Sequence, residues 1–142
     1  VGASFPLPGC APGNGEELID LQPDARIAWW QRHGQSITVP LFALVAAPEP
    51  DRVSPATRAS YRQLAKIDVR NDGKLLWQDQ IPPRSYLLGY VNADHWSIAV
   101  PVAAEIPQAA FLFRDDTPRA ALIGGALDVV ARTLADSAAG GS

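Results

Sequence analysis

The histidine at position 95 is the first residue whose surroundings could support chemistry. The sequence has two histidines, His33 and His95, and His95 directly follows Asp94 in an expected loop between two strands. A carboxylate beside an imidazole could serve as a general acid–base pair. Adjacent residues in a turn usually point apart, however, and no nucleophile is specified by spacing. We therefore predict that His95 makes only a local hydrogen bond, is dispensable, and does not make the protein an enzyme.

The familiar sequence signatures of catalysis and metal binding are absent. The chain contains no HExxH, no GxSxG and no glycine-rich phosphate loop, and its single cysteine, Cys10, cannot form a zinc-binding pair. The net charge of −3 comes from scattered charged residues, without the basic stripe that a nucleic-acid backbone requires. We expect no catalytic residue, no metal, no cofactor and no nucleic-acid partner.

Cys10 is the second residue of chemical interest, because of the residues before it. The run Leu7-Pro8-Gly9-Cys10 resembles the lipobox of bacterial lipoproteins, with a leucine three positions before the cysteine and a small residue immediately before it. The resemblance implies that the Cys10 thiol is diacylated, that the preceding peptide is removed, and that the lipid holds the protein on the periplasmic side of a bacterial membrane. We interpret residues 1–17 as a signal remnant and flexible tether. The alternative is an ordinary leader rich in proline and glycine.

The strongest strand pattern is a β-hairpin over residues 60–81. Apolar and polar residues alternate before its turn, and residues 71–73 are typical of a turn. A three-residue loop, with Gly73 in the left-handed conformation, gathers the large apolar side chains on one face, so we prefer it to a two-residue loop. This register places Val69 and Trp77 in the core.

Four further strands and an exposed loop complete the expected sheet. The loop covers residues 48–59, where three prolines favour a mobile surface connection. The strands are rich in apolar residues and are bounded by turn residues. They comprise residues 36–47, 86–91, 96–102 and 109–114.

Two helices are expected, one on each side of the strands in the sequence. Residues 22–34 carry a proline at the start and a glycine at the end, which favours a helix over a strand at residues 26–31. The second helix has Thr117 as its cap and Pro118 as its first residue. One side of this second helix is an apolar stripe made of Ile123, Leu127, Val130 and Leu134.

These elements predict one α+β domain over residues 18–136. Its sheet is predominantly antiparallel, with five or six strands, and the C-terminal helix packs on one face of that sheet. Residues 137–142 are expected to form a disordered tail.

The function predicted from these features is that of a non-enzymatic cell-envelope lipoprotein, a protein-interaction or assembly component of secretion or envelope machinery. Its expected partner is another envelope protein, bound through Trp29 and Trp30, and its membrane contact is the lipid on Cys10. Glycan stacking on the aromatic residues is a less favoured interpretation. The alternatives are a small secreted or periplasmic enzyme that uses the Asp94–His95 loop, and a soluble binding or immunity protein.

The lipobox resemblance predicts that protein made in the cell with its native signal sequence carries acyl chains on Cys10. Such chains would hold it on a membrane, because each buried methylene contributes about 0.8 kcal/mol. Mass spectrometry should detect the added lipid mass, and Cys10→Ala should abolish it. An unmodified Cys10 thiol, or cleavage at another position, would contradict the lipoprotein interpretation.

Overall fold

The computed structural model describes Ile19 and residues 22–139, and the chain divides into two units between Val39 and Pro40. In the first unit, helix α2 spans Pro23–His33 and continues into a 3-10 turn at Gly34–Ser36. Pro23 opens the helix, and Arg32 and His33 lie at the negative end of its dipole. The helix predicted for residues 22–34 is confirmed.

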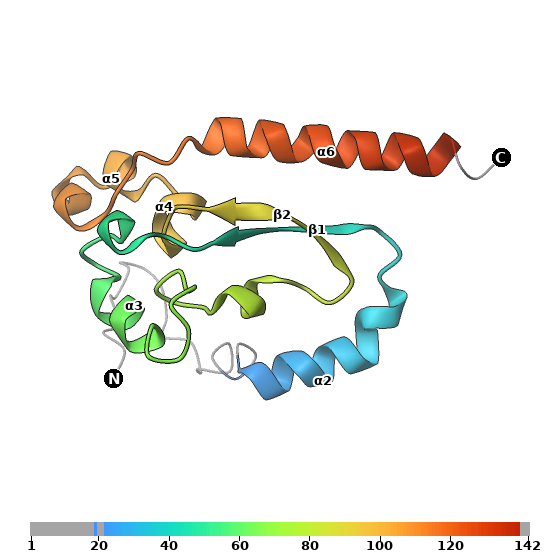
Figure 1. Ribbon diagram of the computed structural model, residues 1–142, viewed down its shortest axis with the longest axis horizontal. Coiled ribbons are helices and arrows are strands. Elements are labelled where there is room, and N and C mark those ends of the chain that lie inside the picture. Colours follow the sequence, from blue (N-terminus) through green and yellow to red (C-terminus); the bar gives the residue numbers. More distant parts are fainter. Residues whose placement is uncertain (1–18, 20–21, 140–142) are drawn as a thin grey trace, which may run out of the picture. The chain divides into compact units, whose positions relative to one another are not determined.

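The second unit is built on two parallel strands (Figure 1). Strand β1 spans Leu41–Ala46 and pairs with β2, Ser85–Val91, with one register shift between Ala43 and Leu44. The predicted antiparallel sheet of five or six strands is therefore wrong, because the described residues form a two-stranded parallel sheet in a mixed α/β arrangement. Parallel strands need a long crossover between them, and residues 47–84 provide it.

The crossover contains a helix where the sequence predicts the first strand of a hairpin. Helix α3 spans Arg58–Leu64 and buries Tyr61. Tyr61 and Ala65 are four residues apart, so they share a side of a helix as well as a face of a strand. The 3-10 turns of this crossover comprise Pro50–Arg52 and Trp77–Gln80.

The turn of the predicted hairpin does form, but the hairpin does not. Gly73 has a φ of +89°, as expected, and a single antiparallel bridge joins Asn71 to Leu76. Val69 is 68% exposed. The Trp77 indole is half-buried, donates a hydrogen bond to Asp68, and lies under the guanidinium of Arg70. The expected core position of Val69 is therefore wrong, and Trp77 belongs to a polar surface cluster.

The loop predicted as exposed is packed into the molecule in part, although Glu49, Pro50 and Ala59 are among its exposed residues. Val53, Ser54 and Thr57 are each 0% exposed. The loop can be buried because its polar groups find partners inside the protein, among them the carboxylate of Asp94.

Helical turns replace the two strands predicted after β2. Helix α4 spans His95–Ala99 and α5 spans Val102–Glu105, and a 3-10 stretch covers Pro107–Leu112. The side chain of Asp94 caps α4, and Ser97 returns the bond in a capping box. This local cap outweighs the β preference of the apolar run that follows.

The closing helix α6 spans Arg119–Ala139, which confirms the predicted helix and extends it beyond residue 136. Its apolar stripe does not pack on the sheet as predicted: Ile123 is 60% exposed and Leu127 is 61% exposed. No helix in the described part of the chain is both long enough and apolar enough to cross a membrane.

Substitutions at two valines distinguish the observed packing from the packing that the predicted hairpin would have. Val45 in β1 is 0% exposed, whereas Val69 is 68% exposed. Val45→Ala should lower the free energy of unfolding by about 2 kcal/mol through lost burial and a new cavity. The same change at Val69 should cost about 0.5 kcal/mol or less. Chemical denaturation of both variants measures the difference, and equal losses would contradict the observed arrangement.

Candidate active site

His95 is paired with Asp72, a residue 23 positions earlier in the sequence. The ring nitrogen Nδ1 of His95 lies 2.8 Å from Oδ2 of Asp72. The backbone also joins the two residues, because the His95 N–H donates to the Asp72 carbonyl at 3.0 Å. The pairing of His95 with Asp94, an alternative raised from the sequence, does not form, because the Asp94 carboxylate accepts hydrogen bonds from other groups. The favoured expectation that His95 makes only a local hydrogen bond is wrong, since its partner is distant in the sequence.

The carboxylate of Asp72 is buried and fixed in orientation. The residue is 2% exposed, and its Oδ1 accepts hydrogen bonds from the backbone N–H groups of Lys74 (2.8 Å) and Leu75 (2.7 Å). Asn71 supports the same turn, since its Oδ1 accepts from the N–H of Gly73 at 3.0 Å. These bonds occupy one carboxylate oxygen and leave the other for His95.

The imidazole of His95 has one nitrogen engaged and one available. Because a carboxylate only accepts hydrogen bonds, Nδ1 must carry a proton, and in the neutral ring Nε2 then carries the lone pair. No described residue hydrogen-bonds Nε2. The side chain is 37% exposed. This geometry suits a general base that is held by a carboxylate on one side and open on the other.

Aromatic rings line one side of the imidazole. The Trp96 ring stands edge-on to His95, with centroids 5.6 Å apart and planes at 89°. Phe113 packs edge-on against Trp96 in turn, with centroids 6.3 Å apart. Such walls position a ring and limit the water around it.

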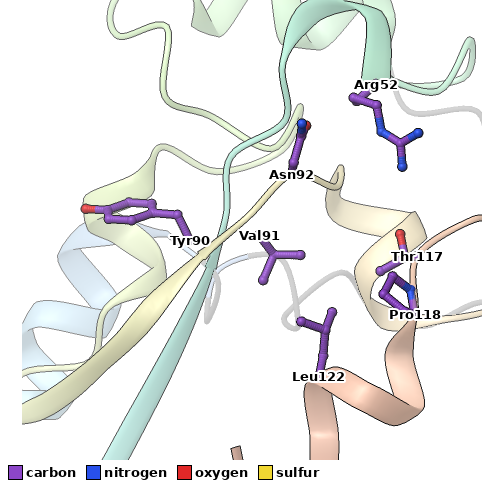
Figure 2. A pocket seen from close by; sticks show the side chains of 7 residues that line it. All are labelled: Arg52, Tyr90, Val91, Asn92, Thr117, Pro118 and Leu122. Atoms are coloured by element: carbon purple, nitrogen blue, oxygen red, sulfur yellow. The ribbon is translucent and has the colours of Figure 1, made fainter. Parts of the chain in front are cut away.

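A separate cavity of about 380 Å³ lies where β2 ends and α6 begins. Val91 and Leu122 point toward one another across it, and Arg52 lies on another side (Figure 2). The Arg52 guanidinium is already paired with Asp116, which limits its use for a ligand. Neither Asp72 nor His95 lines this cavity, so we assign the chemistry to the pair and not to the cavity.

The residues predicted as partner contacts lie in the first unit, on α2. Trp29 and Trp30 pack edge to face, with centroids 5.5 Å apart, and Trp29 is 36% exposed. Partner binding through them stays a prediction. Cys10, the predicted lipidation site, lies outside the described residues. In the described part of the chain, no group of three or more His, Cys, Asp or Glu residues could hold a metal ion.

Sequence reasoning singled out His95 but missed Asp72. In the sequence, Asp72 precedes a glycine and follows an asparagine, so it has the appearance of an ordinary turn residue. Its role becomes visible only when the turn is seen to be buried against the start of α4. The one available signal was that two consecutive turn residues, Asn71 and Asp72, have side chains that can accept hydrogen bonds from the backbone.

Comparison with known proteins identifies a similar enzyme structure. No protein-family model and no curated protein matches the chain. The crystal structure of the metagenomic carboxyl esterase MGS0156 is similar, with a TM-score of 0.82 and 32% sequence identity. The match covers 92% of this chain and 40% of the esterase, so the chain spans well under half of that enzyme's length.

This likeness contradicts two sequence-based predictions, that the protein is not an enzyme and that it acts as a non-enzymatic envelope assembly component. The first rested on the absence of short catalytic motifs, which do not detect a pair formed by residues far apart in the sequence. The second rested on the lipobox resemblance at Cys10 and on the Trp29–Trp30 pair. A carboxyl esterase shares the fold, and the described residues contain a histidine–carboxylate pair.

Substitution of two glycines by alanine tests whether the Asp72 turn requires a glycine at position 73. A Cβ atom on Gly73 would lie 3.0 Å from Cβ of the buried Thr57, and the φ of +89° is unfavourable for other residues. Gly73→Ala should therefore destabilise the protein by about 1–3 kcal/mol. Gly124→Ala, in open space on α6, should instead stabilise it by up to about 1 kcal/mol. Denaturation of both variants tests this, and a stabilising Gly73→Ala would contradict the described turn.

Proposed function

We propose that the protein is a carboxylic ester hydrolase in which His95 is the general base and Asp72 orients it. The observation that carries this proposal is the 2.8 Å contact between Nδ1 of His95 and the buried carboxylate of Asp72. The likeness to a carboxyl esterase supports ester hydrolysis as the reaction. Of the alternatives suggested by the sequence, an enzyme that uses His95 is retained, with Asp72 in place of Asp94.

The pair supplies proton transfer in both halves of such a reaction. Nε2 of His95 takes the proton of a serine hydroxyl as that oxygen attacks the ester carbonyl, and the imidazolium then donates the proton to the departing alcohol. Asp72 keeps the proton of the neutral ring on Nδ1 and stabilises the imidazolium by its charge. In the second half, Nε2 takes a proton from the water that attacks the acyl carbonyl, and the imidazolium returns that proton to the serine oxygen as the acid departs.

The proposal assigns the nucleophile to a residue other than the described ones. Among the described residues, no serine, threonine or cysteine hydrogen-bonds Nε2 of His95. In α/β-hydrolases the three groups follow the order serine, acid, histidine, and here Asp72 precedes His95. The serine is therefore expected before Asp72 in the full-length protein, and the greater length of the similar esterase leaves room for it.

Uncovered apolar surface supports a larger catalytic unit. Ile123 and Leu127 on α6 are exposed, and so are Tyr86 and Leu87 on β2. Parallel sheets are normally covered on both faces, and exposed large apolar side chains favour a packing partner. Additional chain of an esterase-sized protein would cover these side chains and carry the nucleophile.

A nucleophile on the N-terminal side of Cys10 and lipidation of Cys10 exclude one another. Cleavage before Cys10 would separate such a serine from His95, so a protein acylated at Cys10 could not use that serine. Lipidation, the periplasmic location and an envelope partner remain separate predictions, and the mass of the mature protein decides between the two arrangements.

Replacement of either member of the pair should abolish ester hydrolysis by the full-length protein. We expect His95→Ala and Asp72→Asn each to lower kcat/KM for p-nitrophenyl butyrate by about 10³- to 10⁴-fold, because the base is lost or its tautomer is reversed. His33→Ala removes the other histidine, an exposed residue of α2, and is the matched control. It should leave kcat/KM unchanged.

The result is interpretable only if the variants fold, which circular dichroism and the thermal unfolding midpoint would establish. Full activity in a folded His95→Ala protein would overturn the proposal. Equal loss of activity in all three variants would also overturn it, because the effect would then not be specific to the pair.

A further inference from the structure

Asp94 is fully buried, and its carboxylate joins two segments that lie far apart in the sequence. It is 0% exposed, and Oδ2 accepts hydrogen bonds from the Ser54 N–H at 2.6 Å and the Thr57 hydroxyl at 3.0 Å. Oδ1 accepts from the backbone N–H groups of Trp96 at 3.1 Å and Ser97 at 2.9 Å. Four donors on two oxygens satisfy the buried charge.

One side of this network fixes the main chain of His95. Asp94 is the cap of α4, and His95 is the first residue of that five-residue helix. The backbone N–H of Asp94 also donates to the Ser97 hydroxyl at 3.0 Å, which completes the capping box. A helix this short depends strongly on its cap, so the position of His95 depends on Asp94.

The other side of the network reaches the turn that carries Asp72. Thr57, whose hydroxyl donates to Asp94, packs so closely on Gly73 that a Cβ there would lie 3.0 Å from the Thr57 Cβ. Gly73 directly follows Asp72. The Asp94 carboxylate therefore fixes Thr57, and Thr57 in turn packs against the turn that carries Asp72.

Asp94 holds these groups as an anion. Burial raises its pKa, but hydrogen bonds from Ser54, Ser97 and Thr57 lower it more, so the pKa lies below the ordinary value. An asparagine amide cannot reproduce this arrangement, because its NH₂ group would face donors on one side.

We propose that Asp94 is a positioning residue for the proposed esterase, one that sets the relative placement of Asp72 and His95. It does so by capping α4, which begins at His95, and by binding Thr57, which packs on the Asp72 turn. The inference rests on the proposed function but concerns a residue that does not touch the imidazole. Asp94 therefore acts through the geometry of the pair and not on the substrate.

Asp94→Asn in the full-length enzyme tests the proposal most directly. We expect kcat for p-nitrophenyl butyrate to fall by about 10- to 100-fold with KM nearly unchanged, because a displacement of about 1 Å in a reacting group can cost 10²-fold. Asp128→Asn makes the same substitution at an exposed aspartate of α6, outside the hydrogen-bond network of Asp94, and is the matched control. It should retain near wild-type kcat.

Two substitutions at Thr57 separate positioning from folding. Thr57→Val keeps the shape that packs on Gly73 but cannot donate to Asp94, so it should lower kcat in the same manner as Asp94→Asn. Thr57→Ser keeps the hydroxyl and should restore most of the rate. The downfield proton resonance of His95 Nδ1–H should weaken in Asp94→Asn and Thr57→Val and persist in Asp128→Asn.

Wild-type kcat in a folded Asp94→Asn protein would overturn the proposal and leave Asp94 with a purely structural role. If Asp94→Asn does not fold, Thr57→Val decides: an unchanged kcat and an unchanged Nδ1–H resonance would overturn the proposal. Neither outcome bears on the proposed function, which is tested separately by His95→Ala and Asp72→Asn with His33→Ala as the control.

Discussion

The need to satisfy two buried carboxylates governs the part of the molecule beyond the strands. Asp72 and Asp94 are 2% and 0% exposed, and a buried charge is tolerable only when hydrogen bonds replace the water it loses. Backbone N–H groups provide most of those bonds, and they come from residues 54, 74, 75, 96 and 97. Each carboxylate therefore orders the loops around it, and the resulting framework holds His95.

This arrangement explains how a rigid site can be built from segments without regular structure. The carboxyl end of β2 leads within four residues to His95, and the crossover between the parallel strands brings Asp72 to the same place. Loops at the carboxyl ends of parallel strands commonly carry function, because the strands fix where the loops begin. Here buried polar side chains also hold the loops in place, since Ser54, Thr57 and Asn71 are each 0% exposed.

The elements that could be predicted from the sequence are those specified by local signals. The strands at 41–46 and 85–91, the helices α2 and α6, and the positive φ of Gly73 all follow from patterning, proline and glycine. The parallel pairing of β1 with β2 could not be predicted, because an apolar run does not specify which strand it pairs with or in which direction. The helix α4 was missed because the Asp94–Ser97 capping box was hidden by the apolar residues after it.

Prediction of the His95–Asp72 pair needed information that no local pattern contains. His95 was noticed because histidine is rare in the chain, but it was matched with its neighbour in sequence, Asp94. The structure shows that Asp94 serves the backbone of α4 and the 54–57 loop, whereas the distant Asp72 serves the imidazole. Two aspartates with similar burial thus have different roles, which only the hydrogen-bond partners reveal.

The central claim is that His95, held by Asp72, serves a nucleophile located elsewhere in the protein. A crystal structure of the full-length protein treated with an alkyl phosphonate ester would test it most directly. The account predicts a phosphonylated serine whose Oγ lies within about 3 Å of Nε2 of His95, while Nδ1 remains bonded to Asp72. A phosphonylated residue remote from His95, with Nε2 facing solvent, would contradict it.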